Sequence, residues 1–195
     1  MLVEAPSGFV PTDLPTRGIL HAAVTSVARC NDATPQAVLA RLEAGDKAIH
    51  SSFRYWLAKH VAAYLGELDV VFRAFYVYGS AIGFEANPAS DIDVIVVVDR
   101  ACDEVKNLIR QVDLALTTAF RRLLGFSRDP ISLLDIGIVE RTRQAEHCMD
   151  RDGVCRGLHT RPICLWRSDP GSNGGSLTGS PRQSNACPQG PVSPR

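Results

Sequence analysis

Apolar residues recur at helical spacing in four stretches of the chain, which predicts four helices. These stretches cover residues 15–28, 35–44, 47–66 and 103–124. Thr34-Pro35 is a typical helix start, with Thr34 as the N-cap, and Gly125 is placed to end the last helix. The aromatic residues within 47–66 keep the helical spacing, so we interpret them as core packing rather than as a ligand site.

Shorter apolar runs predict strands. Residues 72–78, 91–98 and 131–139 are rich in β-branched and aromatic side chains, and residues 163–166 form a last short candidate. Residues 81–89 are expected to form a short helical turn or loop, with Asn87-Pro88 as a breaker. The order strand, helix, strand over 91–139 is typical of a crossover unit, although the direction of strand pairing is not fixed by the pattern. In the third run, Ile131, Leu133, Asp135, Gly137 and Val139 share a face. If the second and third strands are neighbours, Asp135 is expected to face the same side as Asp91 and Asp93.

Composition favours an ordinary globular protein. The chain has 195 residues, 45% of them apolar, and a formal net charge of zero, so no global charge draws it to nucleic acid or to acidic membranes. The first residues lack the pattern of a secretory signal, and no apolar stretch is long enough to span a membrane, so we expect a cytoplasmic protein with no membrane partner.

The fold class we predict is α/β (α+β), with a small mixed β-sheet flanked by helices. Residues 1–66 form an N-terminal helical extension and residues 67–167 the sheet-containing domain. Residues 168–195 are mostly Gly, Ser and Pro and are expected to be a disordered tail. An unnatural or out-of-frame C-terminus is an alternative explanation of this tail.

The six cysteines are scattered: Cys30, Cys102, Cys148, Cys155, Cys164 and Cys187. The last four lie in the C-terminal third, with His147 and His159 among them, but their spacing matches no standard zinc-binding motif. We therefore expect free thiols rather than a zinc site or a disulfide framework.

Three acidic residues carry the functional hypothesis. Asp91 and Asp93 flank Ile92 at the start of a strongly apolar run, and Asp135 is the one charge inside the 131–139 run. Carboxylates are costly in such places unless a cation neutralises them, and two at alternate positions of a strand point the same way. Oxygen ligands on one face suit a divalent metal ion, and the upstream Gly79-Ser80 turn suits a phosphate.

Plainer interpretations of the same residues stay open. An Asp-x-Asp pair after a loop often caps a turn or a helix, although the aliphatic strand that Asp91 and Asp93 flank makes this less fitting. Asp135 is also compatible with a partly exposed position on an edge strand. His50 and His60, on the predicted N-terminal helices, are expected to be packing or surface residues.

The ordered combination resembles the nucleotidyltransferase superfamily with the DNA polymerase β-like fold. Tyr78-Gly79-Ser80 is followed, after residues 81–90, by Asp91-Ile92-Asp93-Val94, and Leu134-Asp135-Ile136 matches the late acidic element of that family. The resemblance covers about residues 70–140 and is greatest to the minimal nucleotidyltransferases.

This resemblance implies an enzyme that transfers a nucleoside monophosphate from a nucleoside triphosphate, by default ATP, to a hydroxyl of a protein, an RNA or a small molecule. Asp91, Asp93 and Asp135 are then the catalytic residues and the ligands of two Mg²⁺ ions. Gly79 and Ser80 are then the nucleotide-binding residues, where the missing Cβ of glycine lets the phosphates approach the backbone.

The chain departs from the family pattern in two places. The common motif has three residues between the Ser and a second glycine, whereas only Ala81 and Ile82 separate Ser80 from Gly83. The region after the third strand, where relatives carry acceptor-binding elements, leads into the tail. These departures put the phosphate grip of the loop and the acceptor site in question. A rival hypothesis is a catalytically degenerate member that acts as an antitoxin-like binding module, with the helices in 15–65 in contact with a protein partner. Retention of all three acidic residues argues against such degeneracy.

Overall fold

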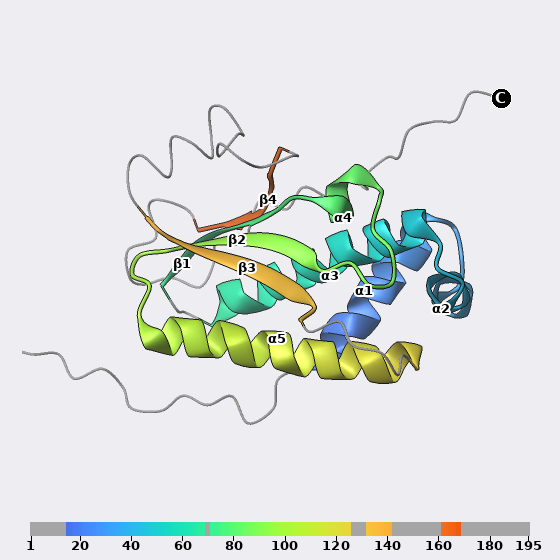
Figure 1. Cartoon of the computed structure of the whole chain (residues 1–195), viewed down its shortest axis with the longest axis horizontal. Helices are drawn as coiled ribbons and strands as arrows, with labels where there is room; N and C mark the ends of the chain where they lie inside the picture. Colours follow the sequence, from blue (N-terminus) through green and yellow to red (C-terminus); the bar gives the residue numbers. More distant parts are fainter. Residues whose placement is uncertain (1–14, 69–70, 126–131, 142–160, 169–195) are drawn as a thin grey trace, which may run out of the picture.

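The computed structural model describes residues 15–68, 71–125, 132–141 and 161–168. In this part of the chain, three helices come first, and strands and helices then follow one another (Figure 1). The elements are α1 (Thr16–Cys30), α2 (Pro35–Glu43), α3 (Lys47–Glu67), β1 (Phe72–Val77), α4 (Ser80–Gly83), β2 (Ile92–Val98), α5 (Asp103–Leu124), β3 (Leu134–Glu140) and β4 (Ile163–Arg167). The predicted fold class, a mixed α/β arrangement with a small sheet flanked by helices, is confirmed.

Local sequence signals explain where the helices begin and end. The Thr34 hydroxyl accepts a hydrogen bond from the Ala37 N–H at 3.2 Å, so Thr34 is the N-cap of α2 as predicted. The Asp46 carboxylate caps α3 in the same way, through the Ile49 N–H at 3.1 Å. Gly125 takes the left-handed conformation that ends α5, with φ of 65°.

The four strands form one mixed sheet in the order β3-β2-β1-β4. β1 pairs antiparallel with both β2 and β4, whereas β2 and β3 are parallel. Helix α5 connects the two parallel strands, so β2-α5-β3 is the crossover unit that the sequence pattern indicates. The pairing direction, which the pattern had left open, is thereby settled.

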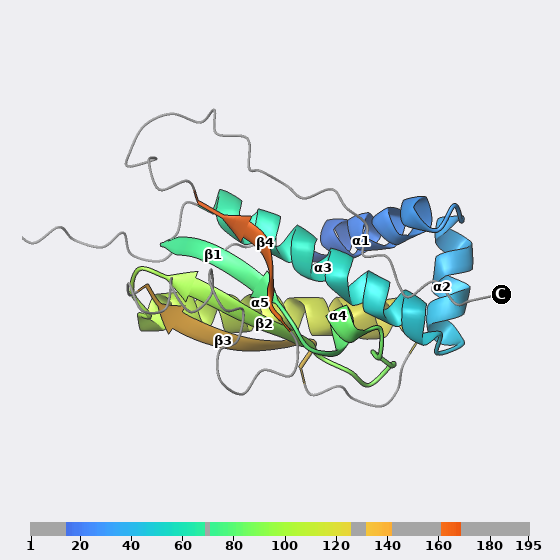
Figure 2. The same cartoon turned by 90° about the horizontal axis from the view of Figure 1, so that it is seen from above.

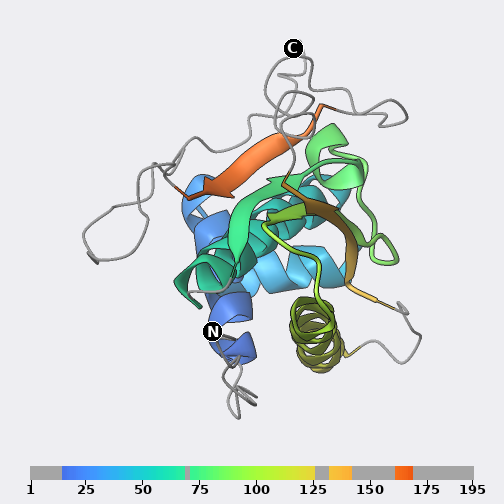
Figure 3. The same ribbon diagram turned by 90° about the vertical axis from the view of Figure 1, so that its left-hand side faces the viewer.

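The helices cover one face of the sheet. Seen end-on, α1, α3 and α5 lie on the same side of the strands, and from above α3 runs beneath β1 and β4 toward α4 (Figures 2 and 3). Ile92, Val94, Val96 and Val98 of β2 belong to the same core cluster as residues of α1, α2, α3 and α5. This alternation leaves Asp93, Ile95 and Val97 on the opposite face of the sheet.

β3 is shorter than predicted. It begins at Leu134 rather than at Ile131, which lies outside the described residues. We expected Leu133 to share the face of Asp135, but Leu133 is fully buried in the helix-side core together with Leu134. The alternation of faces does not reach Leu133 because this residue precedes the strand.

Two other expectations concern membranes and thiols. Within the described helices, none combines the length and the apolar character that a membrane crossing requires. Cys30 and Cys102 are free thiols, as predicted. Cys148, Cys155 and Cys187 lie outside the described residues, as does the predicted disordered tail from residue 169 onward.

Candidate functional site

The three acidic residues meet at one end of the parallel strand pair. Asp93 of β2 is the register partner of Asp135 of β3, and Asp91 lies two residues before Asp93. Register partners on neighbouring parallel strands lie side by side on the same face, with the strands about 4.8 Å apart. The side chains of Asp93 and Asp135 therefore project from the face opposite the helices, as the sequence argument requires.

The charge of each acid acts on its neighbours. The pKa of Asp93 is raised, first because the side chain is half-buried and then because the carboxylates of Asp91 and Asp135 repel its negative charge. A hydrogen bond from the Ser80 backbone N–H opposes this rise only in part. Asp91 and Asp135 are exposed to solvent. The site is thus a cluster of like charges with Asp93 at its centre.

Gly79 is required by the position of Asp93. The backbone there has φ of 71°, and a Cβ added to Gly79 would lie 1.9 Å from Asp93 Oδ2. Only a residue without a side chain allows this approach. The Tyr78 N–H donates to the Asp93 carbonyl oxygen at 3.1 Å, which fixes the end of β1 against β2. The Gly79-Ser80 turn therefore lies directly against Asp93 of the acidic cluster, as the sequence analysis predicts.

The shortened loop after Ser80 forms a single helical turn, α4. The Gly79 carbonyl accepts hydrogen bonds from the N–H groups of Ile82 and Gly83, both at 3.1 Å. Phe84 then takes a left-handed conformation, with φ of 58°, and ends the turn. The second glycine thus lies inside the turn.

Helix α3 holds the loop between the two motifs. Ser51, which is fully buried, donates from its hydroxyl to the Ser80 carbonyl at 3.4 Å and accepts from the Ala86 N–H at 3.1 Å. One turn later, the buried Arg54 donates to the Ser90 carbonyl at 2.7 and 3.0 Å and to the Pro88 carbonyl at 3.3 Å. Both ends of the loop are therefore attached to neighbouring turns of one helix.

The guanidinium of Arg54 is an unusual buried charge. Burial lowers the pKa of Arg54 to about 10, and the negative charge of Asp91 opposes this shift. His50 Nδ1 accepts a hydrogen bond from Arg54 Nη1 at 2.8 Å, and His50 Nε2 donates to the Leu42 carbonyl at 2.9 Å. His50 is therefore a buried packing residue, as expected, and it orients the arginine that faces the acidic cluster.

On the other side of the site, α5 fixes the start of β3. The carboxylate of Asp113 accepts from the N–H groups of Leu133 and Leu134 at 3.1 and 2.9 Å and from the Ser132 hydroxyl at 2.6 Å. These contacts set the chain in place one residue before Asp135. Asp113 thus determines where β3 presents its acid.

The donor set suits a hard cation. Three carboxylates supply only oxygen, which is the ligand that Mg²⁺ takes, and their mutual repulsion disappears when a divalent ion lies between them. Within the described ranges, however, no group of three or more His, Cys, Asp or Glu side chains is arranged closely enough to hold a metal ion as it stands. Two of the carboxylates are exposed side chains, which reorient at little cost.

Sequence reasoning identified the five residues at the front of this site but not the three behind them. Ser51 and Arg54 occur in a predicted amphipathic helix, on a stretch where nearly every position is buried, so periodicity alone gave no sign of their polar contacts. Asp113 belongs to no motif that the sequence analysis recognises. A polar residue on the core side of a helix was the one signal available.

Comparisons with protein-family models, with curated proteins and with solved structures find no match to this chain.

Proposed function

We propose that this protein is a Mg²⁺-dependent nucleotidyltransferase that transfers a nucleoside monophosphate from a nucleoside triphosphate, with ATP as the first donor to test, to a hydroxyl acceptor. The observation that carries the proposal is the parallel register that pairs Asp93 with Asp135, with Asp91 two residues away. Together with the Gly79-Ser80 turn against Asp93, this is the constellation that such chemistry requires.

The residues divide the work as follows. Asp91 and Asp93 hold the metal-bound triphosphate, and Asp135 completes the ligand set and accepts the proton of the attacking hydroxyl. Gly79 lets the phosphates approach the backbone, and Ser80 offers its hydroxyl. When bound, Mg²⁺ neutralises charge on the phosphate oxygens. The acceptor oxygen forms a bond to the α-phosphorus while the bond from that phosphorus to the bridging oxygen of pyrophosphate breaks.

Transfer of label tests the proposal directly. The protein is incubated with Mg²⁺, a lysate as acceptor source, and ATP labelled on either the α- or the γ-phosphate. We expect acceptors labelled from α-labelled ATP alone, and no labelling by Asp91→Asn/Asp93→Asn. The control is Asp103→Asn, which removes an exposed carboxylate from the first turn of α5. Equal labelling by the wild type and by the double variant would sink the proposal for that donor.

A second candidate, a binding module with a degenerate site, has one observation in its favour. Between α1, α2 and α5 lies a largely apolar cavity of about 830 Å³, and Leu114 on its α5 wall is 67% exposed. Exposed apolar surface of this kind is typical of protein interfaces. The helices in this wall include those that the rival hypothesis assigns to a protein partner.

Thermal unfolding separates the two candidates. A working site binds ATP with Mg²⁺ in the folded state only, so the melting temperature rises with ATP concentration by mass action. This rise must require both ATP and Mg²⁺ and must be absent in Asp91→Asn/Asp93→Asn. A protein that shows no rise, but gains stability from a protein partner, is the binding module.

A further inference from the structure

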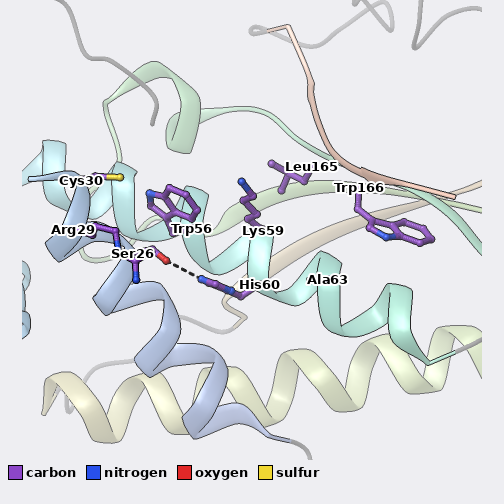
Figure 4. A pocket seen from close by; sticks show the side chains of 9 residues that line it. All are labelled: Ser26, Arg29, Cys30, Trp56, Lys59, His60, Ala63, Leu165 and Trp166. Carbon is purple, nitrogen blue, oxygen red and sulfur yellow. Dashed lines mark hydrogen bonds between the residues drawn. The ribbon is translucent and has the colours of Figure 1, made fainter. Parts of the chain in front are cut away.

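A second cavity, of about 420 Å³, lies away from the acidic cluster, between α1, α3 and β4 (Figure 4). Its size is within the range of small-molecule sites in proteins. The described residues that line it are Ser26, Arg29, Cys30, Trp56, Lys59, His60, Ala63, Leu165 and Trp166. The strands β2 and β3, which carry Asp93 and Asp135, contribute no residue to this lining, whereas α3, which holds the loop before Asp91, forms one wall of it. None of the residues assigned to the proposed transferase site lines this cavity.

The wall from β4 is set by a glycine of α3. A Cβ added to Gly66 would lie 2.5 to 2.8 Å from atoms of the Trp166 indole. Trp166 therefore rests directly on the backbone of α3, and a residue larger than glycine at position 66 would push the indole away. Trp166, Leu165 and Ala63 together give this end of the cavity an apolar surface on which a flat ring can pack.

The other end of the cavity is positively charged. Arg29 of α1 and Lys59 of α3 both line it, and the Lys59 ammonium lies 4.7 Å from the centroid of the Trp56 ring. Among the described lining residues there is no carboxylate. Figure 4 shows the Lys59 side chain between the two indoles, so a ligand anion there would also reach the ring-packing surface.

Two further polar groups lie in the cavity wall and add no charge to it. His60 Nε2 and the Ser26 hydroxyl lie 3.0 Å apart and partner each other, and burial lowers the pKa of His60, so this pair adds no charge near neutral pH. The Trp56 indole N–H is buried and has no acceptor within the described part of the chain. Because this atom is shut off from solvent, it is also closed to a ligand in the cavity, and Trp56 offers the ligand only the surface of its ring.

We propose that this cavity binds a small aromatic carboxylic acid, with its carboxylate at Arg29 and Lys59 and its ring against Trp166, Leu165 and Ala63. The cations select the acid, and the indole and aliphatic surface selects the ring. The proposal stands on the walls of this cavity alone and does not require that the protein be a transferase.

The chain contains two tryptophans, Trp56 and Trp166, and both line the cavity. Tryptophan fluorescence of the full chain therefore reports on this site directly. The probe is 3-phenylpropionate, which does not absorb where tryptophan is excited, and its neutral match is 3-phenylpropanamide. For a ligand of this size we expect saturable binding with a dissociation constant on the order of 1 mM, and binding of the amide weaker by at least about fivefold.

Substitutions assign the binding to this cavity. Arg29→Gln, at an exposed position on α1, should weaken binding of 3-phenylpropionate by about fivefold, and adding Lys59→Gln should weaken it further. Arg122→Gln removes a cation from the wall of the other cavity and should change nothing. Asp91→Asn/Asp93→Asn should bind the probe as the wild type does, which keeps this test separate from the transferase test.

Gly66→Ala and Trp56→Phe complete the design. Gly66→Ala displaces Trp166 and should weaken binding, while Trp56→Phe leaves Trp166 as the one fluorophore and should retain a signal that saturates. Circular dichroism confirms that each variant is folded. The proposal is overturned if the amide binds as tightly as the acid, if Arg29→Gln binds unchanged, or if no saturation occurs at about ten times the expected dissociation constant.

Discussion

The Arg54 Nη2 atom donates a 2.7 Å hydrogen bond to the carbonyl oxygen of Ser90, the residue directly before Asp91. A second donor of the same guanidinium, Nε, reaches that carbonyl at 3.0 Å. This planar, two-pronged contact fixes both the position and the orientation of the peptide that leads into the first acid of the cluster. The negative charge of Asp91 in turn opposes the lowering of the Arg54 pKa that burial causes.

Replacement of Arg54 should therefore affect stability and the site together. Arg54→Met keeps the apolar volume but leaves the Ser90 and Pro88 carbonyls without their donor, and we expect a loss of about 3 kcal/mol in the free energy of unfolding. Arg54→Lys keeps the charge but not the planar fork, so an intermediate loss of about 1 to 2 kcal/mol is expected. Denaturant unfolding measures both.

The control for Arg54 is Arg41→Met. Arg41 pairs with Asp46 at 2.7 Å, but its side chain is 47% exposed, so this substitution should cost less than about 1 kcal/mol. If Arg41→Met and Arg54→Met lower the free energy of unfolding by the same amount, the hydrogen bonds of the buried Arg54 do not hold the loop. In a folded Arg54→Lys variant, binding of ATP with Mg²⁺ should weaken, because the acids are then less firmly positioned.

Gly79 should tolerate no side chain. Gly79→Ala forces a Cβ into the Asp93 carboxylate, which must then rotate away from the Ser80 N–H, and it also places alanine at a positive φ. We expect a loss of at least about 2 kcal/mol in the free energy of unfolding. Measured by thermal unfolding, binding of ATP with Mg²⁺ should be lost as well.

Gly125→Ala separates the two causes of this loss. Gly125 also has a positive φ, of 65°, but its added Cβ would meet no atom within 4 Å in the described structure. This variant should lose only about 1 kcal/mol in the free energy of unfolding, the cost of placing alanine at a positive φ, and should keep ATP binding. A Gly79→Ala variant no less stable than Gly125→Ala would contradict the close contact with Asp93.

The helices and strands were predictable because their signals are local. Alternation and helical spacing located α1, α2, α3, α5 and the four strands to within a few residues, and Thr34 and Gly125 were recognised as a cap and a stop. Asp91 and Asp93 stood out because a carboxylate next to an aliphatic strand needs a compensating partner, and Gly79 stood out because a Gly-Ser turn just upstream suits a phosphate. These inferences rest on residues close together in the chain.

The contacts that assemble the site are not local. Ser51 and Arg54 reach the loop at Ala86 and Ser90, 35 and 36 residues away, and Asp113 reaches Leu134 over 21 residues. No spacing rule connects such positions, because the fold alone decides which helix turn faces which loop. For the same reason the sequence could place Asp135 beside Asp93 only on the condition that β2 and β3 are neighbours.

Asp113 should be essential to the start of β3. Asp113→Ala removes an acceptor of the Leu134 N–H group, and it leaves the Leu133 N–H with Thr117 Oγ1 and the Ser132 hydroxyl with the Leu134 carbonyl as their other acceptors. We expect a loss of about 1 to 2 kcal/mol in the free energy of unfolding. Asp113→Asn retains one acceptor oxygen and should lose less. Hydrogen exchange should show faster exchange at Leu134 in both variants. Unchanged exchange at this amide would mean that the backbone hydrogen bonds between β3 and β2 hold the strand without help from Asp113.

The acidic cluster should give the protein a characteristic dependence on pH. The pKa of Asp93 is raised in the folded protein above its ordinary value of 3.8, through burial and then through the charges of Asp91 and Asp135. The folded state therefore holds this proton more tightly than the unfolded state. Between the ordinary and the raised pKa, the free energy of unfolding then falls as the pH rises, and above the raised value the full cost remains.

Removal of one of the repelling charges should reverse part of this cost. Asp135→Asn should raise the free energy of unfolding by about 0.2 to 0.5 kcal/mol near pH 7, a small gain because Asp135 is exposed and solvent screens its charge. The gain should vanish well below the raised pKa of Asp93, where the Asp93 carboxyl group is protonated and has no charge to be repelled. Asp103→Asn, in the first turn of α5, should instead lower stability, because an acid there favours the helix.

Magnesium should change the sign of the Asp135→Asn effect. If the three carboxylates share a divalent cation, Mg²⁺ removes the repulsion in the wild type and stabilises its folded state by mass action. Asp135→Asn has lost one ligand and should gain less, so at a sufficient Mg²⁺ concentration the wild type becomes the more stable protein. Thermal unfolding over a magnesium titration measures this crossing. If Asp135→Asn remains more stable than the wild type at every Mg²⁺ concentration, the three acids repel one another without holding a metal ion.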